Sequence, residues 1–172
     1  MKNLMKKLAA QEQKGFTLIE ILVVIGIIAV LAAIVLIAIN PARQFALSRN
    51  AQRQSNVNAI LNAIGQRMVD NRGLFETGCA AGPIPTLAAA EMTKTGGYDI
   101  RPCIVPLYIS EIPIDPTSGT NTCTDAACTG QDYNTKYTVQ QDTVNRRITV
   151  CAPLAAGETA IQPIPATICV TR

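Results

Sequence analysis

The stretch KGFTLIE, residues 14–20, is followed at once by an apolar run over residues 21–39 that contains no polar side chain. A hydrocarbon core about 30 Å thick needs roughly 20 consecutive apolar residues in a helix. Because lipid offers no partner for the backbone, the peptide groups of such a segment must be bonded within it. The sequence therefore predicts a membrane-spanning helix, which we place at residues 16–40.

A basic leader, residues 1–15, precedes this helix. It contains four lysines and a single acidic residue, Glu12. A secretory signal peptide is cut after its apolar core, whereas Gly15 lies before this one. A cut after Gly15 would remove the leader and keep the apolar helix. Basic residues that precede a membrane helix stay on the cytoplasmic side, so we expect all residues after the helix to face away from the cytoplasm.

Glu20 is the acidic residue at the start of the apolar segment. A charged residue within a membrane helix costs about 2.5–3.5 kcal/mol on insertion scales, and such residues usually have a function. A cut after Gly15 would free the amine of Phe16, which is a cation about one helical turn from Glu20. The two groups could pair within one chain or between neighbouring chains, or Glu20 could simply reach the membrane interface.

Gly15 before the junction, Phe16 after it and Glu20 at the fifth position of the cleaved chain resemble the signature of type IV prepilins and pseudopilins. The resemblance is specific over residues 14–40 and only architectural beyond them. It implies cleavage between Gly15 and Phe16 by a membrane prepilin peptidase and N-methylation of the Phe16 amine. It also implies that Glu20 guides the assembly of subunits into a filament.

The charge balance changes once the leader is removed. The precursor has a net charge of +3, but loss of four lysines and one glutamate leaves eleven basic and eleven acidic side chains (15 − 4 and 12 − 1). A neutral mature chain argues against nucleic-acid binding. The chain also has no histidine, the commonest general base, and we expect it to be a substrate of enzymes and not an enzyme.

Six cysteines all lie after the membrane helix, in the part expected outside the cytoplasm, where disulfides form. They are Cys79, Cys103, Cys123, Cys128, Cys151 and Cys169. We propose the pair Cys151–Cys169 because the strands around these residues could pair, Cys123–Cys128 because it closes a small loop, and Cys79–Cys103 from what remains. Without histidine or a second cysteine pair of matching spacing, a zinc site is not expected, and we predict no metal or cofactor.

The rest of the chain divides into a stem and a head. Pro41 should kink or break the helix, and residues 41–72 repeat apolar side chains at helical spacing. The stripe consists of Val57, Ile60, Leu61, Ile64 and Met68. Residues 73–172 predict a disulfide-rich head, with short helical turns near 86–92 and 103–110 and strands at 136–141, 147–152 and 166–171. The expected fold is α+β, with a long N-terminal helix packed on a small antiparallel sheet, as the pilin resemblance also implies.

The segment 108–116 looks like the one that precedes the β-region of major pseudopilins, in which the following loop binds calcium. Asp115, Asp125 and Asp132 could supply oxygen ligands here. We prefer to interpret them as turn-forming aspartates, because Cys123 and Cys128 could hold the same loop without a metal.

Three functions remain open from the sequence. The first is a structural subunit of a type IV pilus, which forms a helical homopolymer outside the cell and serves adhesion, motility or DNA uptake. The second is a major pseudopilin of a type II secretion system, and the third is a membrane-anchored binding protein without a filament. The first two imply a precursor in the cytoplasmic membrane, a prepilin peptidase, and an assembly platform with its ATPase as partners.

Overall fold

The computed structural model describes residues 15–124 and 131–172, and the chain divides after Pro41 into two compact units. The first unit contains the helix α2, Leu18–Ile39, in which no residue is buried. This is the one helix among the described residues that is long and apolar enough to cross a membrane, a test that a signal sequence near the N-terminus also passes.

The helix is interrupted at a single residue. Asn40 takes the left-handed conformation with φ 47° and ψ 81°, which ends α2 at Ile39. The next helix, α3, starts at Pro41 and runs to Asp70. Proline is tolerated at this first position because its missing N–H would have no partner within the helix. The interruption lies beside the proline at which the sequence predicts a kink or break.

The second unit contains α3 and a five-stranded antiparallel sheet with the order β1-β3-β4-β5, in which β2 also pairs with β3. The strands are β1 Ala90–Thr93, β2 Thr120–Cys123, β3 Gln131–Gln141, β4 Ile148–Ala152 and β5 Ile168–Thr171. The long central strand β3 alternates buried and half-buried residues from Tyr133 onward, as expected for a strand with one face on a core.

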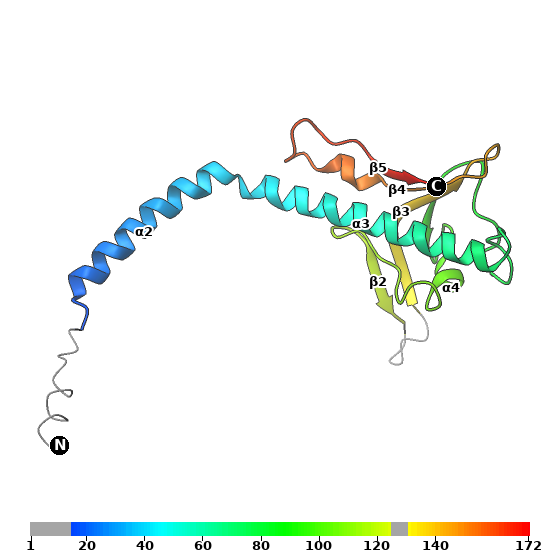
Figure 1. Cartoon of the computed structure of the whole chain (residues 1–172), viewed down its shortest axis with the longest axis horizontal. Helices are drawn as coiled ribbons and strands as arrows, with labels where there is room; N and C mark the ends of the chain where they lie inside the picture. The colour runs from blue at the N-terminus through cyan, green and yellow to red at the C-terminus, as the bar shows by residue number, and fades with distance from the viewer. Residues whose placement is uncertain (1–14, 125–130) are drawn as a thin grey trace, which may run out of the picture. The chain divides into compact units, whose positions relative to one another are not determined.

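Helix α3 supplies the other side of that core, and it runs along the sheet in Figure 1. Val57, Ile60 and Ile64 are fully buried in the same cluster as Tyr137 and Val150. The apolar stripe of the helix is therefore covered by the sheet, which is the arrangement that its three- and four-residue spacing requires. The α+β fold with a helix on a small antiparallel sheet is confirmed.

Two local predictions for the head were incomplete or wrong. The segment 86–92, expected as a helical turn, contributes to the strand β1, and β2 was not expected at all. Both strands pair with β3, which lies later in the chain. Their conformation depends on this distant partner, so local periodicity could not reveal it. The other expected turn, near 103–110, overlaps the short helix α4, Arg101–Ile104, only at its first two residues.

The structure joins Cys79 to Cys103 and Cys151 to Cys169, with Cα–Cα distances of 5.2 and 4.1 Å. The second bond links residues that are directly opposite on β4 and β5. Cys123 is also disulfide-bonded, while Cys128 lies outside the described residues. Two of the three pairs proposed from the sequence therefore appear in the structure.

Candidate functional site: the processing junction and the head that it carries

The expected cleavage junction lies just before α2, outside regular structure. Residues 15–17 are not helical, and the Phe16 side chain is 85% exposed. Thr17 has extended backbone angles and is the N-cap of α2. The bond between Gly15 and Phe16 is therefore accessible on non-helical backbone, as a peptidase that cuts there would require.

Glu20 folds back on this cap. Its Oε2 accepts hydrogen bonds of 2.7 Å from both the backbone N–H and the hydroxyl of Thr17. In return, the Glu20 N–H donates to the Thr17 hydroxyl oxygen at 3.2 Å. This reciprocal pair is a capping box, and it holds the carboxylate at the same end of the helix as Phe16.

Sequence reasoning missed the part played by Thr17. The signal was present, because a threonine followed three residues later by a glutamate, just before an apolar run, predicts a capping box. From the sequence, Glu20 is expected to be a partner for the Phe16 amine or an interfacial carboxylate, and not part of a helix cap. In the structure of one chain, Glu20 is bonded to Thr17, so a partner from a second chain would have to share or replace these bonds.

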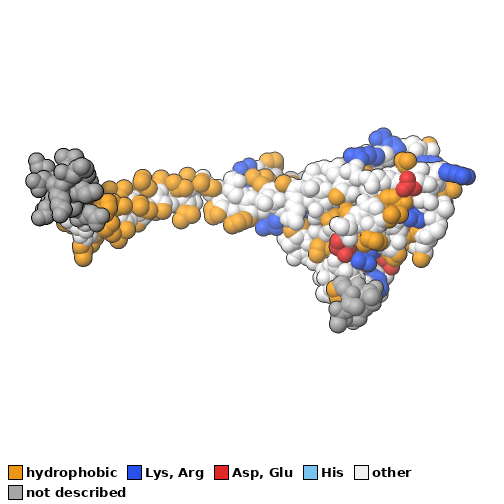
Figure 2. Space-filling view, turned by 60° about the horizontal axis from the view of Figure 1, so that its bottom comes forward, with side chains coloured by type: hydrophobic (Ala, Val, Ile, Leu, Met, Phe, Trp, Pro, Cys, Tyr) orange, Lys and Arg blue, Asp and Glu red, His pale blue; other side chains and the backbone are white. Residues whose placement is uncertain are grey.

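The side chains of α2 itself are apolar on every face of the helix. Figure 2 shows them along the length of the helix, and even Ile37, at 85%, is exposed within this chain. Gly26 has no neighbour that a side chain would meet. Such a surface is unfavourable in water by about 25 cal/mol per Å², so lipid or other copies of the helix must cover it.

Residues 11–36 match the family model described as the prokaryotic N-terminal methylation motif. The chain carries a prokaryotic N-terminal methylation motif. This motif is the class III signal of type IV pilins and pseudopilins. It fits a membrane-anchored precursor and points to a structural subunit and not to an enzyme. No curated protein and no solved structure shows significant similarity to the chain.

The head is fastened to α3 by a buried network of charged side chains, which we call the Arg53 clamp: Arg49, Arg53, Asp115 and Glu158. Arg53 is 1% exposed and contacts Asp115 at 2.7 Å and Glu158 at 2.6 Å. Arg49 binds the same Glu158 through two hydrogen bonds. Two segments far apart in the sequence are thereby held on one helix.

Of the three candidate calcium ligands, the structure describes Asp115 and Asp132. Asp115 is saturated by Arg53, by the Thr117 hydroxyl and by two backbone N–H groups that follow it, so it is a turn-forming residue and an ion-pair partner. Asp132 lies on β3 with an exposed position, and Asp125 lies outside the described residues. Among the described residues, no group of three possible metal ligands occurs.

The Arg53 clamp predicts a large effect of a single substitution. Arg53→Met keeps an unbranched apolar stem but leaves Asp115 buried without its cation, and loss of one partner of a buried pair costs about 3–5 kcal/mol. Arg49→Met is the matched control, because Arg49 is partly exposed and should contribute about 1 kcal/mol or less. Urea unfolding of the full chain in detergent measures both. Equal losses for the two variants would contradict a central role for Arg53.

The same clamp predicts a stability that falls in acid. Hydrogen bonds from Arg49, and then from Arg53, outweigh burial and lower the pKa of Glu158 from 4.5 to about 2. For Asp115, burial raises the pKa, but hydrogen bonds from Arg53 and Thr117 outweigh it, so the net pKa is also lowered. A carboxylate whose pKa is lower in the folded state stabilises the fold above its unfolded pKa.

Stability should therefore stay constant from pH 7 to about 5 and fall as the pH drops from about 4.5 towards 2. Urea unfolding at a series of pH values provides the measurement. Glu158→Gln should be less stable at pH 7 and should show a shallower loss in acid. A Glu158→Gln profile parallel to that of the wild type would show that Glu158 does not carry the pH dependence.

Proposed function

We propose that this chain is the structural subunit of a type IV pilus. It is inserted in the cytoplasmic membrane as a prepilin, cut between Gly15 and Phe16, methylated at Phe16, and assembled into an extracellular helical filament. One observation carries the proposal: the methylation motif, residues 11–36, includes most of a helix that is apolar on all sides and buried nowhere in its own chain.

A filament core provides what α2 lacks within one chain. The helix leaves lipid at little cost only if it enters an equally apolar environment, and a bundle of α2 helices from neighbouring subunits is such an environment. The head, with its polar surface and disulfides, then lies on the outside of the filament. An assembly platform and its ATPase would supply the work of extraction.

In such a core, the Glu20 carboxylate needs a partner of opposite charge. We propose that it meets the Phe16 amine of an adjacent subunit during docking, while the Thr17 cap holds the carboxylate near the end of the helix. Because an unpaired buried charge costs about 3–5 kcal/mol, subunits docked in the wrong register would be rejected.

A major pseudopilin of a type II secretion system is the second candidate. It is supported by the segment 108–116, whose Ile-Pro-Ile-Asp-Pro run resembles that group. Long surface fibres made of this chain would favour the pilus, whereas a short filament that depends on secretion genes would favour the pseudopilin. A membrane-anchored binding protein would form neither kind of filament.

Processing should leave a defined N-terminus. The mature chain should begin at Phe16, because the cut lies before the apolar core. With its disulfides reduced, its mass should exceed that of residues 16–172 by the one CH2 that methylation of the amine adds. Intact mass and N-terminal sequencing of the purified protein measure this. A mature N-terminus within or after α2 would show that the segment is an ordinary signal sequence.

Three substitutions separate the roles of charge and cap at the start of α2. Glu20→Ala removes the charge and the hydrogen bonds that the carboxylate accepts from Thr17. Glu20→Gln removes the charge but keeps a hydrogen-bond acceptor, and Thr17→Val keeps the charge but removes the hydroxyl of the cap. Both Glu20 variants should be cut normally yet assemble at least tenfold fewer fibres when no other subunit is present, because loss of 3–5 kcal/mol exceeds a factor of ten. Thr17→Val should keep more fibres than either.

Counts of fibres by electron microscopy, together with immunoblots for the uncut precursor, provide the readout. Normal fibre numbers in both Glu20 variants would show that Glu20 is only an interfacial carboxylate. A defect in Thr17→Val as severe as that of Glu20→Gln would assign the effect to helix capping and not to charge pairing.

A further inference from the structure

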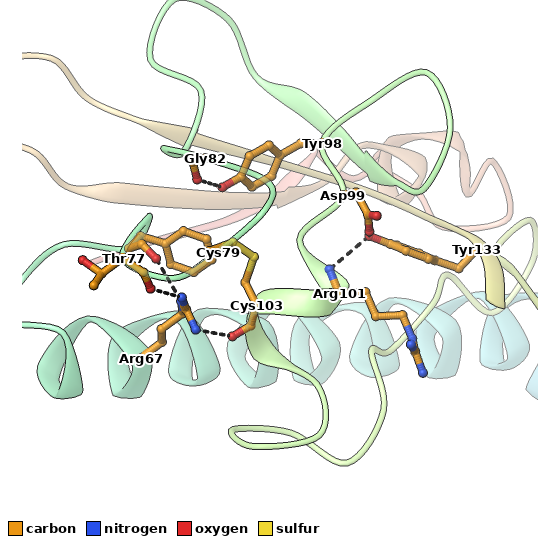
Figure 3. Close-up of a disulfide and its surroundings, with 10 residues drawn as sticks. Arg67, Thr77, Cys79, Gly82, Tyr98, Asp99, Arg101, Cys103 and Tyr133 are labelled. Carbon is orange, nitrogen blue, oxygen red and sulfur yellow. Dashed lines mark hydrogen bonds between the residues drawn. A yellow bond between two sulfur atoms is a disulfide. The ribbon is translucent and has the colours of Figure 1, made fainter. Parts of the chain in front are cut away.

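Arg67, in the last turn of α3, is a buried cation held by backbone carbonyls. The residue is 8% exposed, and among the described residues no carboxylate forms an ion pair with it. Its Nε donates to the Phe75 carbonyl at 2.8 Å, its Nη2 to the Thr77 carbonyl at 2.6 Å and its Nη1 to the Cys103 carbonyl at 2.8 Å. Figure 3 shows this arrangement beside the disulfide.

The three carbonyls belong to the two segments that the Cys79–Cys103 disulfide joins. Phe75 and Thr77 lie just before Cys79, and the third carbonyl is that of Cys103 itself. The guanidinium also lies 5.3 Å from the centre of the Phe75 ring, a distance at which a cation–π contact is favourable. One side chain therefore holds the backbone on both sides of the bond.

Loop length alone does not favour the Cys79–Cys103 disulfide over a disulfide between Cys103 and Cys123. Cys79 and Cys103 are 24 residues apart, and Cys103 is separated from Cys123 by a similar number of residues. The probability of closing a loop falls only as about the three-halves power of its length, so these two pairings differ by less than about twofold. Something other than loop length must bring Cys103 to Cys79.

We infer that Arg67 is a positioning residue for oxidative folding, which brings the Cys79 and Cys103 thiols together before they are joined. The contacts to Phe75 and Thr77 span only eight and ten residues, so they can form early, once α3 is helical. The remaining N–H groups of the guanidinium then capture the carbonyl of Cys103. Cys103, once its carbonyl is bound, therefore lies next to the segment 75–77 that Arg67 already holds on α3.

The chemical step is ordinary thiol–disulfide exchange. One cysteine thiolate attacks a disulfide donor to give a mixed disulfide, and the second cysteine attacks that bond. The two thiols lose two protons and two electrons, and the donor is reduced to two thiols. Arg67 takes no part in this exchange and acts only on the distance between the two sulfur atoms.

Arginine suits this role for two reasons. Its planar fork of five N–H donors can serve three carbonyls at fixed angles, whereas the ammonium of lysine is a point charge. A cation in the last turn of a helix also interacts favourably with the helix dipole. Arg67→Lys should therefore keep the charge and still lose much of the positioning.

The test uses the full chain in detergent, reduced and unfolded, then refolded in a buffer of reduced and oxidised glutathione. Peptide mapping without reduction gives the equilibrium constant of each disulfide with glutathione. In Arg67→Met and Arg67→Lys, the constant for Cys79–Cys103 should fall at least tenfold, and Cys103 should appear in other pairs. The constant for Cys151–Cys169 should change less than twofold.

Arg101→Met is the matched control, because Arg101 lies on the same short helix as Cys103 but its guanidinium binds the Glu111 carboxylate and, among the described residues, none of the carbonyls that Arg67 binds. It should leave both constants within twofold of the wild type. Equal losses for both disulfides in Arg67→Met would show general destabilisation of the head and overturn the inference. Unchanged constants would overturn it as well. Neither outcome depends on whether the chain forms filaments.

Discussion

The apolar surface of α2 is the constraint on which the biology of this chain depends. Its side chains project in every direction, and none is covered by the chain's own residues. The free energy of that surface favours transfer to lipid or to a bundle of like helices, and a capping box at Thr17 and Glu20 defines where the helix begins. The apolar surface of α2 needs cover from outside the chain, whereas the head has its own core. This difference agrees with the division of the chain into two compact units.

Within the second unit, two arginines of α3 organise the irregular parts of the head. Arg53 binds carboxylates at positions 115 and 158, and Arg67 binds carbonyls at positions 75, 77 and 103. Much of the head between β-strands has little regular structure, so its loops need restraint from elsewhere. Charge-assisted hydrogen bonds from a rigid helix supply it, and the Cys79–Cys103 disulfide covalently joins the two segments that Arg67 binds. Lost stability after a change in either arginine would therefore appear first in the loops.

The methylation motif and the overall class of the fold could be predicted from residues near one another in the chain. The motif at residues 14–20 needs only local spacing, and the stripe on α3 needs only helical periodicity. The strands β1 and β2 could not be predicted in this way, because their partners on β3 lie up to 49 residues away (Ala90 with Val139). The role of Thr17 could be predicted from its spacing to Glu20, because a threonine three residues before a glutamate is typical of a capping box.

The sequence by itself determined the long apolar helix, the methylation motif, the break beside Pro41 and the confinement of cysteines to the head, because each depends on composition or on short spacing. Only the tertiary structure decided what Arg53, Arg67, Asp115 and Glu158 do. All four are charged residues that a sequence places on the surface by default, yet all four are buried. Burial of a charge requires partners at defined distances, and those partners come from segments that only the folded chain brings together.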